Sequence, residues 1–147
     1  MEYILLLTAC INPDGMPFTC LADVGVRKKQ YIEALNFYLK NTTRKIVFVE
    51  NSGTDISSSF KDFQHRIEFL CFDGNLCFDK RKGKGYGEAL ILEYAMAKSE
   101  FITDDVLIFK LTGRLQLINI NRLIHYMDKL SPSKNFVCVV PPQNNSV

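Results

Sequence analysis

The amino-acid sequence predicts a three-layer α/β domain built on a mostly parallel sheet of about five strands. Two observations favour this class. Short apolar runs alternate along the chain with longer segments whose apolar residues recur at helical spacing. Several of the short runs are apolar throughout, as expected for parallel strands that are covered on both faces. With 147 residues, 47% of them hydrophobic, the chain can bury a core of its own.

The first half of the chain predicts three strands and one helix. Residues 3–8 are continuously apolar and form the first strand. Residues 26–40 carry apolar side chains at helical spacing, which predicts an amphipathic helix. Residues 45–49 and 66–71 are two further apolar runs, and each is followed by a turn rich in Asn, Asp, Ser or Gly. We expect both to be buried strands.

The second half predicts two helices and two strands. Residues 79–87 form a loop rich in Lys and Gly, and residues 88–99 form a helix that is apolar on most sides. A helix of that kind is usually covered by protein. Residues 106–109 predict the fourth strand, residues 120–130 an amphipathic helix, and residues 136–140 the fifth strand. Helices between parallel strands then cover both faces of the sheet.

Composition and charge exclude several classes of protein. Eighteen Lys and Arg against sixteen Asp and Glu leave a net charge of +2, which by itself gives no indication of nucleic-acid binding. No apolar run approaches the ~20 residues of a membrane-spanning helix. The run after Glu2 lacks the basic segment of a signal peptide. We therefore expect a cytoplasmic protein with one domain, residues 1–140, and a polar tail, residues 141–147.

The cysteines and histidines predict no metal site. The cysteines are odd in number and contain no CxxC pair, so we expect buried free thiols in a reducing compartment. The five cysteines are Cys10, Cys20, Cys71, Cys77 and Cys138. His65 and His125 lie outside the segments singled out below, and no Ser/His/Asp or Cys/His arrangement is evident.

The segment Lys80–Glu88 is the most distinctive candidate for ligand binding. Four basic residues and three glycines precede a predicted helix amino terminus, where backbone N–H groups and the helix dipole favour an anion. The pattern is neither a P-loop nor the dinucleotide-binding fingerprint. The alternative is a solvated basic loop.

Two other strand ends offer ligand groups, because ligands bind at the carboxyl ends of parallel strands. A carboxylate in residues 50–55 could accept hydrogen bonds from a ribose or a base edge, whereas the alternative is a turn that caps the next helix. Residues 8–13 present a similar choice between a base-binding loop and a plain turn.

The fourth strand ends in Lys-Leu-Thr-Gly-Arg, residues 110–114. Gly113 permits the close approach of a ligand or a turn with positive φ. Arg114 could form a bidentate contact with a phosphate. The alternative is a surface arginine that follows a turn.

Together these segments resemble the nucleotide-binding, Rossmann-like half of a GT-A glycosyltransferase. Residues 50–55 are similar to the acidic turn that holds the nucleoside in the large family-2 group, and residues 83–90 are similar to its glycine-rich approach to a buried helix. Bacterial polysaccharide and O-antigen glycosyltransferases resemble the chain more closely. Their recurring phrases are similar to residues 8–13, 84–89 and 110–114, and the resemblance spans about residues 3–122.

The resemblance implies a nucleotide-sugar donor, a saccharide or lipid-linked acceptor, and a role in polysaccharide or lipopolysaccharide synthesis, peripheral to the inner membrane face. It assigns no catalytic residue. The nucleoside would contact Thr8, Ala9, Cys10, Asn12, Glu50, Asn51 and Asp55. The donor phosphates would contact Lys84, Gly85, Gly87, Lys110, Thr112, Gly113 and Arg114.

The chain departs from the GT-A pattern in two ways. GT-A enzymes commonly carry Asp-x-Asp at the exit of the fourth strand, where it holds a divalent cation, whereas this exit has Lys110 to Arg114 and the pair Asp104 and Asp105 precedes the strand. We therefore expect no metal or other cofactor. GT-A enzymes are also longer, and their acceptor site and general base usually lie in the later half. The chain would then correspond to a fragment, a truncated gene product or a minimal relative.

Three functions remain open from the sequence. The first is a glycosyltransferase, the second a non-catalytic domain that binds a nucleotide or sugar phosphate, and the third an assembly domain of a polysaccharide-synthesis complex. We also expect a homodimer, because the apolar stripe of residues 120–130 or the strand 136–140 would otherwise lack a partner.

Overall fold

The computed structural model describes residues 2–16, 19–76 and 79–129. It contains a four-stranded sheet in which every pairing is parallel, which confirms the α/β class. In spatial order the strands are β3 (Ile67–Cys71), β2 (Lys45–Glu50), β1 (Glu2–Ala9) and β4 (Val106–Thr112). The predicted fifth strand, residues 136–140, and the predicted tail, residues 141–147, lie outside the described residues.

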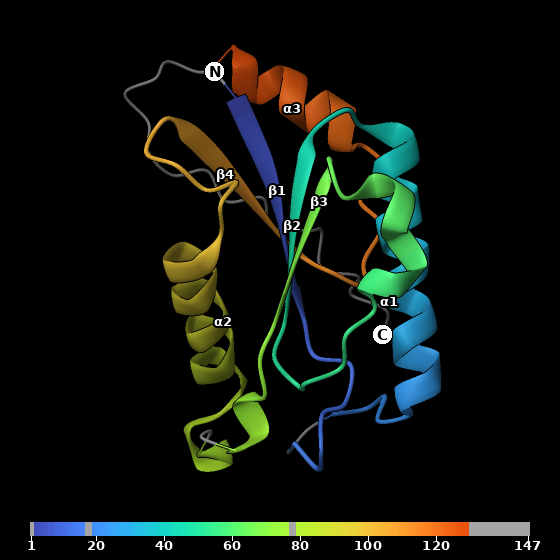
Figure 1. The fold of residues 1–147 in the computed structure, drawn as a ribbon, viewed down its shortest axis with the longest axis vertical. Helices are drawn as coiled ribbons and strands as arrows, with labels where there is room; N and C mark the ends of the chain where they lie inside the picture. Colours follow the sequence, from blue (N-terminus) through green and yellow to red (C-terminus); the bar gives the residue numbers. More distant parts are fainter. Residues whose placement is uncertain (1, 17–18, 77–78, 130–147) are drawn as a thin grey trace, which may run out of the picture.

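Helices cover both faces of this sheet, so the fold has three layers (Figure 1). One face carries α1 (Val24–Asn41), the 3₁₀ segment η1 (Ser57–Phe63) and α3 (Ile120–Asp128). The other face carries α2 (Lys84–Lys98). Two short 3₁₀ segments, η2 (Gly74–Leu76) and η3 (Lys80–Lys82), lead into α2. Within the described part of the chain, every helix is too short or too polar to cross a membrane.

The central strand β1 is buried on both faces, which requires an unbroken apolar run in the sequence. Its residues from Tyr3 to Ala9 are all buried. Successive side chains of a strand point to opposite faces, so Leu5 and Leu7 join the cluster under α1, whereas Ile4 and Leu6 join the cluster under α2. The buried strands β1 and β2 are as predicted. The outer strand β3 is only half-buried beyond Ile67.

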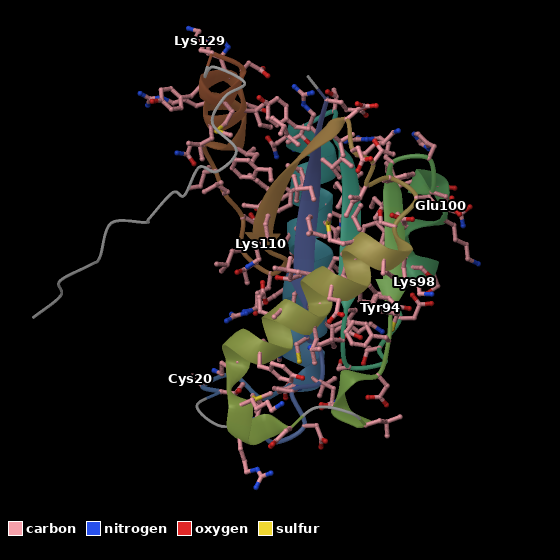
Figure 2. The ribbon with its side chains drawn as sticks, turned by 90° about the vertical axis from the view of Figure 1, so that its left-hand side faces the viewer. Cys20, Tyr94, Lys98, Glu100, Lys110 and Lys129 are labelled. Carbon is pink, nitrogen blue, oxygen red and sulfur yellow. The ribbon has the colours of Figure 1, made fainter. Side chains whose placement is uncertain are left out.

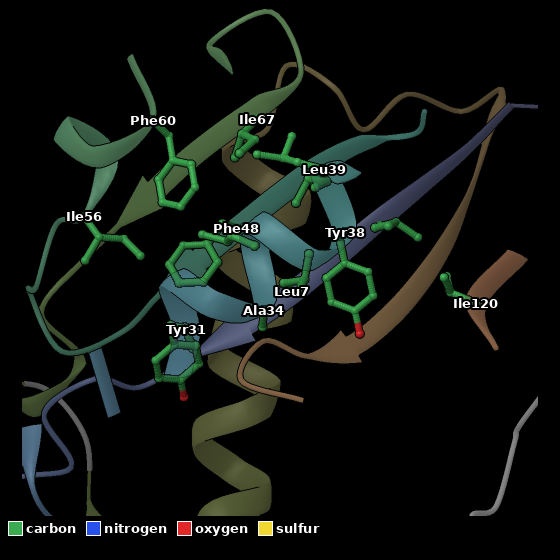
Figure 3. Packing of buried hydrophobic residues seen from close by; sticks show 14 of the residues in the cluster. Leu7, Tyr31, Ala34, Tyr38, Leu39, Phe48, Ile56, Phe60, Ile67 and Ile120 are labelled. Atoms are coloured by element: carbon green, nitrogen blue, oxygen red, sulfur yellow. The ribbon is translucent and has the colours of Figure 1, made fainter. Parts of the chain in front are cut away.

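The larger apolar cluster lies between the sheet and α1 (Figure 3). The ring of Tyr31 packs edge-on against Phe48 of β2, with 5.9 Å between ring centroids. Tyr38 is fully buried, and its hydroxyl donates to the carbonyl of Leu115 at 2.7 Å and accepts from the N–H of Leu117 at 3.1 Å. Burial raises the pKa of the Tyr38 hydroxyl. Helix α1 therefore holds the turn that follows β4.

Two predicted element boundaries and one predicted exposure are wrong. Helix α2 begins at Lys84, so the glycine-rich segment forms its first turn, where N–H groups need no intrahelical partner. Strand β4 continues to Thr112, because its last residues pair with β1. Helix α2 is not covered on most sides. Only Gly87, Ile91 and Ala95 are buried, and Met96 is 59% exposed, since one side of the helix packs on the sheet.

The apolar stripe of α3 packs within its own chain. Ile120 and Ile124 are buried in the cluster under α1, and Leu123 and Met127 are half-buried. The side-chain amide of Asn121 donates to the carbonyl of Asn41 at the end of α1. The predicted homodimer therefore needs a surface other than the buried part of this stripe.

The order of the strands reverses between β1 and β4. The chain moves outward from β1 through α1 to β2, and it returns from β3 through α2 to the far side of β1. The β1–α1–β2 and β3–α2–β4 connections run in opposite directions along the sheet and over opposite faces. The two crossovers therefore have the same handedness. Neighbouring strands at such a reversal leave a crevice at their carboxyl ends. Residues following β1 and β4 therefore define the place to look for a site.

The burial of β1 yields a stability prediction. Leu7→Ala, at a fully buried position, should lower the free energy of unfolding by about 2–5 kcal/mol, because it removes apolar contacts and leaves a cavity. The matched variant Leu76→Ala, at a side chain that is 81% exposed, should change it by less than about 0.5 kcal/mol. Urea denaturation of both variants measures the difference, and equal effects would contradict the placement of β1 at the centre.

Candidate functional site

A cavity of about 400 Å³ lies at the reversal point, beyond the carboxyl ends of β1, β2 and β4. Helix α1, the first turns of α2 and the loop after β1 complete its walls. Figure 2 shows Cys20 of that loop close to the start of α2. Eight residues singled out in the sequence line this cavity: Thr8, Ala9, Cys10, Asn51, Lys84, Gly87, Thr112 and Arg114.

The other six predicted site residues are not among the lining residues of this cavity. They are Asn12, Glu50, Asp55, Gly85, Lys110 and Gly113. Most of them have contacts within the protein that account for their positions, and these contacts show how the cavity is built.

Glu50 is a buried organising carboxylate, only 1% exposed. It accepts hydrogen bonds from the backbone N–H groups of Ile11 at 2.9 Å, Ser52 at 3.0 Å and Thr54 at 2.8 Å, and from the Ser52 hydroxyl. A buried carboxylate is tolerated when hydrogen bonds replace its hydration. These bonds engage both carboxylate oxygens and join the loop after β1 to the loop after β2.

Asp55 and Asn12 stabilise turns. The Asp55 carboxylate accepts from the N–H of Ser57 at 2.8 Å and from its hydroxyl at 2.9 Å, at the start of η1. The Asn12 side chain accepts from the N–H of Asp14 at 3.2 Å, and the Asn12 N–H donates to the Ser52 hydroxyl at 2.9 Å. For these two residues, the geometry matches the turn-forming alternative.

Lys110 is engaged with α2. Its ammonium group forms an ion pair with Glu88, and the Thr8 hydroxyl donates to the same carboxylate oxygen at 2.9 Å. Figure 2 shows Lys110 on β4 beside α2. Glu88 is the one carboxylate among the residues that line the cavity, and Lys110 balances its charge.

Gly113 permits a close approach of two backbones. Its N–H donates to the Thr8 carbonyl at 2.9 Å. A Cβ at this position would stand 2.8 Å from that carbonyl oxygen and 3.3 Å from the Tyr31 ring. Any larger residue would push the end of β4 away from β1 and α1.

Two residues that the sequence analysis missed form the α1 wall. Arg27 is 7% exposed, and its guanidinium donates to the carbonyls of Cys10 and Leu21, the former at 2.9 Å from Nε. Tyr31 accepts from the N–H of Cys10 at 3.0 Å. Burial raises the pKa of the Tyr31 hydroxyl, and the nearby charges of Arg27 and Arg114 partly offset this rise. The signal was present, because Arg27 lies one helical turn before Tyr31 on the apolar stripe.

The α2 wall presents a helix amino terminus to the cavity. Lys84 and Gly87 belong to its first turn, and the preceding Gly83 adopts φ of 81°, a conformation that favours glycine. Its N-cap residue, Gly83, has no side chain that could cap this end. With Arg27, Lys84 and Arg114 around the cavity, the arrangement suits an anionic ligand.

The thiols differ from the expectation of buried cysteines. Cys10, Cys20 and Cys71 are thiols outside any disulfide, but Cys20 is exposed and the other two are half-buried. Cys77 and Cys138 lie outside the described residues. Among residues 2–16, 19–76 and 79–129, no three His, Cys, Asp or Glu side chains gather as a metal-binding group.

Comparison with protein-family models, curated proteins and solved structures found no match for this chain.

The Cys71 thiol yields a pH-dependent prediction. Burial, and then the charge and hydrogen bond of the Glu50 carboxylate, raise its pKa from 9.0 to about 11. The folded state then holds this proton where the unfolded chain loses it, so the stabilisation present below pH 9 should disappear between pH 9 and pH 11.

Peptide-resolved alkylation tests this value. Because the thiolate is the reactive form, the rate at Cys71 in the folded protein should rise with a midpoint near pH 11. The same peptide labelled in urea serves as the control and should show a midpoint near 9. A common midpoint in both conditions would contradict the coupling between Cys71 and Glu50.

Proposed function

We propose that the protein binds a nucleotide-sugar in the cavity and acts as a glycosyltransferase in polysaccharide or lipopolysaccharide synthesis. The observation that carries the proposal is the position of the cavity at the reversal of a parallel sheet, with cationic groups around it. Parallel α/β folds bind nucleotides at such a reversal. The resemblance of the strand ends and of the glycine-rich turn to GT-A glycosyltransferases supports the sugar donor.

The first requirement of the transfer is neutralisation of the leaving diphosphate. Backbone N–H groups at the start of α2 and the ammonium group of Lys84 are suited to that charge. The nucleoside would then lie toward Cys10 and Asn51, at the ends of β1 and β2. The Oδ1 atom of Asn51 is buried and has no hydrogen-bond partner among the residues that the structure describes, so a donor group of the ligand would satisfy it.

A second candidate function is a binding domain without turnover. Transfer also requires a base that removes the proton of the acceptor hydroxyl. Glu88 is the one carboxylate among the lining residues, and it is already engaged by Lys110 and Thr8. This engagement favours binding without catalysis. Hydrolysis or transfer of a bound donor distinguishes the two functions.

Binding of UDP or GDP tests both candidates. Titration of either nucleotide should shift the amide resonances of residues 8–13, 50–55, 84–87 and 110–114 together, because these segments converge on or support one cavity. The resonances of α3 serve as the internal reference. A response confined to α3, or no response to either nucleotide, would contradict the proposed site.

Nucleotide affinity should not depend on a divalent cation. The amino terminus of α2 and the ammonium group of Lys84 supply positive charge where the diphosphate is proposed to lie. We expect calorimetric titrations of UDP in EDTA and in Mn²⁺ to agree within tenfold, which is about 1.4 kcal/mol. A larger gain in Mn²⁺ would mean that a metal carries the diphosphate charge.

A further inference from the structure

The cationic groups of the cavity fall into two sets on opposite sides of the sheet. Lys84 and the amino terminus of α2 lie on one side. Arg27 of α1 lies on the other. Arg114 lines the cavity from the turn after β4, next to Gly113, where a Cβ would stand 3.3 Å from the ring of Tyr31 on α1. In the sequence, Lys84 and Arg114 are equivalent candidates for contacts with the donor phosphates, whereas the fold places them on different walls of the cavity.

Arg27 carries a buried charge that no described carboxylate balances. Its hydrogen-bond partners among the described residues are the carbonyls of Cys10 and Leu21 and, at 3.4 Å, the hydroxyl of Tyr31, all of them neutral. A buried charge is costly unless an opposite charge compensates it. Because Arg27 also lines the cavity, an anionic ligand could supply that compensation.

Arg114 adds a second positive charge at the same place. Among the described residues, none forms a hydrogen bond or an ion pair with its side chain. The charges of both arginines lower the pKa of the Tyr31 hydroxyl, against the larger effect of its burial. Two like charges that line one cavity attract an oxyanion. Arg114 can bind a carboxylate or phosphate through paired hydrogen bonds, whereas Arg27, whose N–H groups but one are engaged, contributes mainly its charge.

We propose that Arg27 and Arg114 form an oxyanion subsite, separate from the diphosphate position at α2, so that the bound substrates carry a second anionic group. This inference rests on the proposed function. The chemistry is that of a carboxylate or phosphate held by two guanidinium groups. Its source is either a carboxylate on the transferred sugar, as in a nucleotide-linked hexuronic acid, or the phosphate of a lipid-linked acceptor.

Calorimetry with the full chain and Arg114→Gln tests the subsite. The probes are UDP, UDP-glucose, UDP-glucuronate and, in the presence of UDP, a short-chain polyprenyl phosphate, with the corresponding GDP ligands in parallel. The variant should bind UDP-glucuronate or the polyprenyl phosphate at least tenfold more weakly. It should bind UDP and UDP-glucose within twofold of the unmodified chain.

Two further variants make the result specific. Arg122→Gln removes an exposed arginine of α3 that is not among the cavity residues, and it should change no affinity. Arg114→Lys keeps the charge and should restore part of the lost affinity. Whichever anionic probe responds to Arg114→Gln identifies the source of the second anion.

The outcomes separate this inference from the proposed function. If nucleotides bind but Arg114→Gln weakens neither anionic probe, the subsite is wrong and the nucleotide site stands. If the variant weakens UDP as much as UDP-glucuronate, the arginines hold the diphosphate itself, and the second anion is wrong. If the unmodified chain binds no UDP or GDP ligand, both proposals are overturned.

Discussion

The carboxylate of Glu50 joins the ends of three strands around the cavity through hydrogen bonds. It accepts from Ile11 after β1, from Ser52 and Thr54 after β2, and from the thiol of Cys71 at the end of β3, at 3.6 Å. Because the group is buried, these donors replace its lost hydration, and no loop can move away without leaving charge unsatisfied. The walls formed by Cys10 and Asn51 therefore depend on a residue that does not itself line the cavity.

The sequence predicts the centre of the fold better than its periphery. β1 and β2 are recognisable because strands buried on both faces require unbroken apolar runs. Helix α2 is equally apolar in composition, yet it lies at the surface, since exposure depends on how many elements pack around it. The composition of a helix does not show how many elements pack around it. The sequence also predicts the start of α2 too late, at residue 88 instead of Lys84, because Gly85 and Gly87 have low helix propensity but occupy the first turn.

The candidate site was predictable as a set of strand ends but not as an arrangement of side chains. Lys110 and Arg114 belong to the same five-residue segment. The ammonium group of Lys110 nevertheless pairs with Glu88 of α2, whereas the charge of Arg114 acts on Tyr31 of α1. Residues four apart in a strand point to the same face, so the separation comes from the turn that follows Thr112, where β4 ends. The sequence does not predict Arg27 as a site residue, because an arginine on a helix is usually solvated. Only the tertiary fold buries it against the loop after β1.

The placement of α3 restricts how the sheet can be extended. A further parallel strand at the outer edge of β4, reached through α3, would continue in the direction of the α2 connection but over the opposite face. Its hand would be opposite to that of the α1 and α2 connections, and nearly all such parallel crossovers are right-handed. The face on which α3 packs therefore does not suit a right-handed parallel crossover from β4 to that edge.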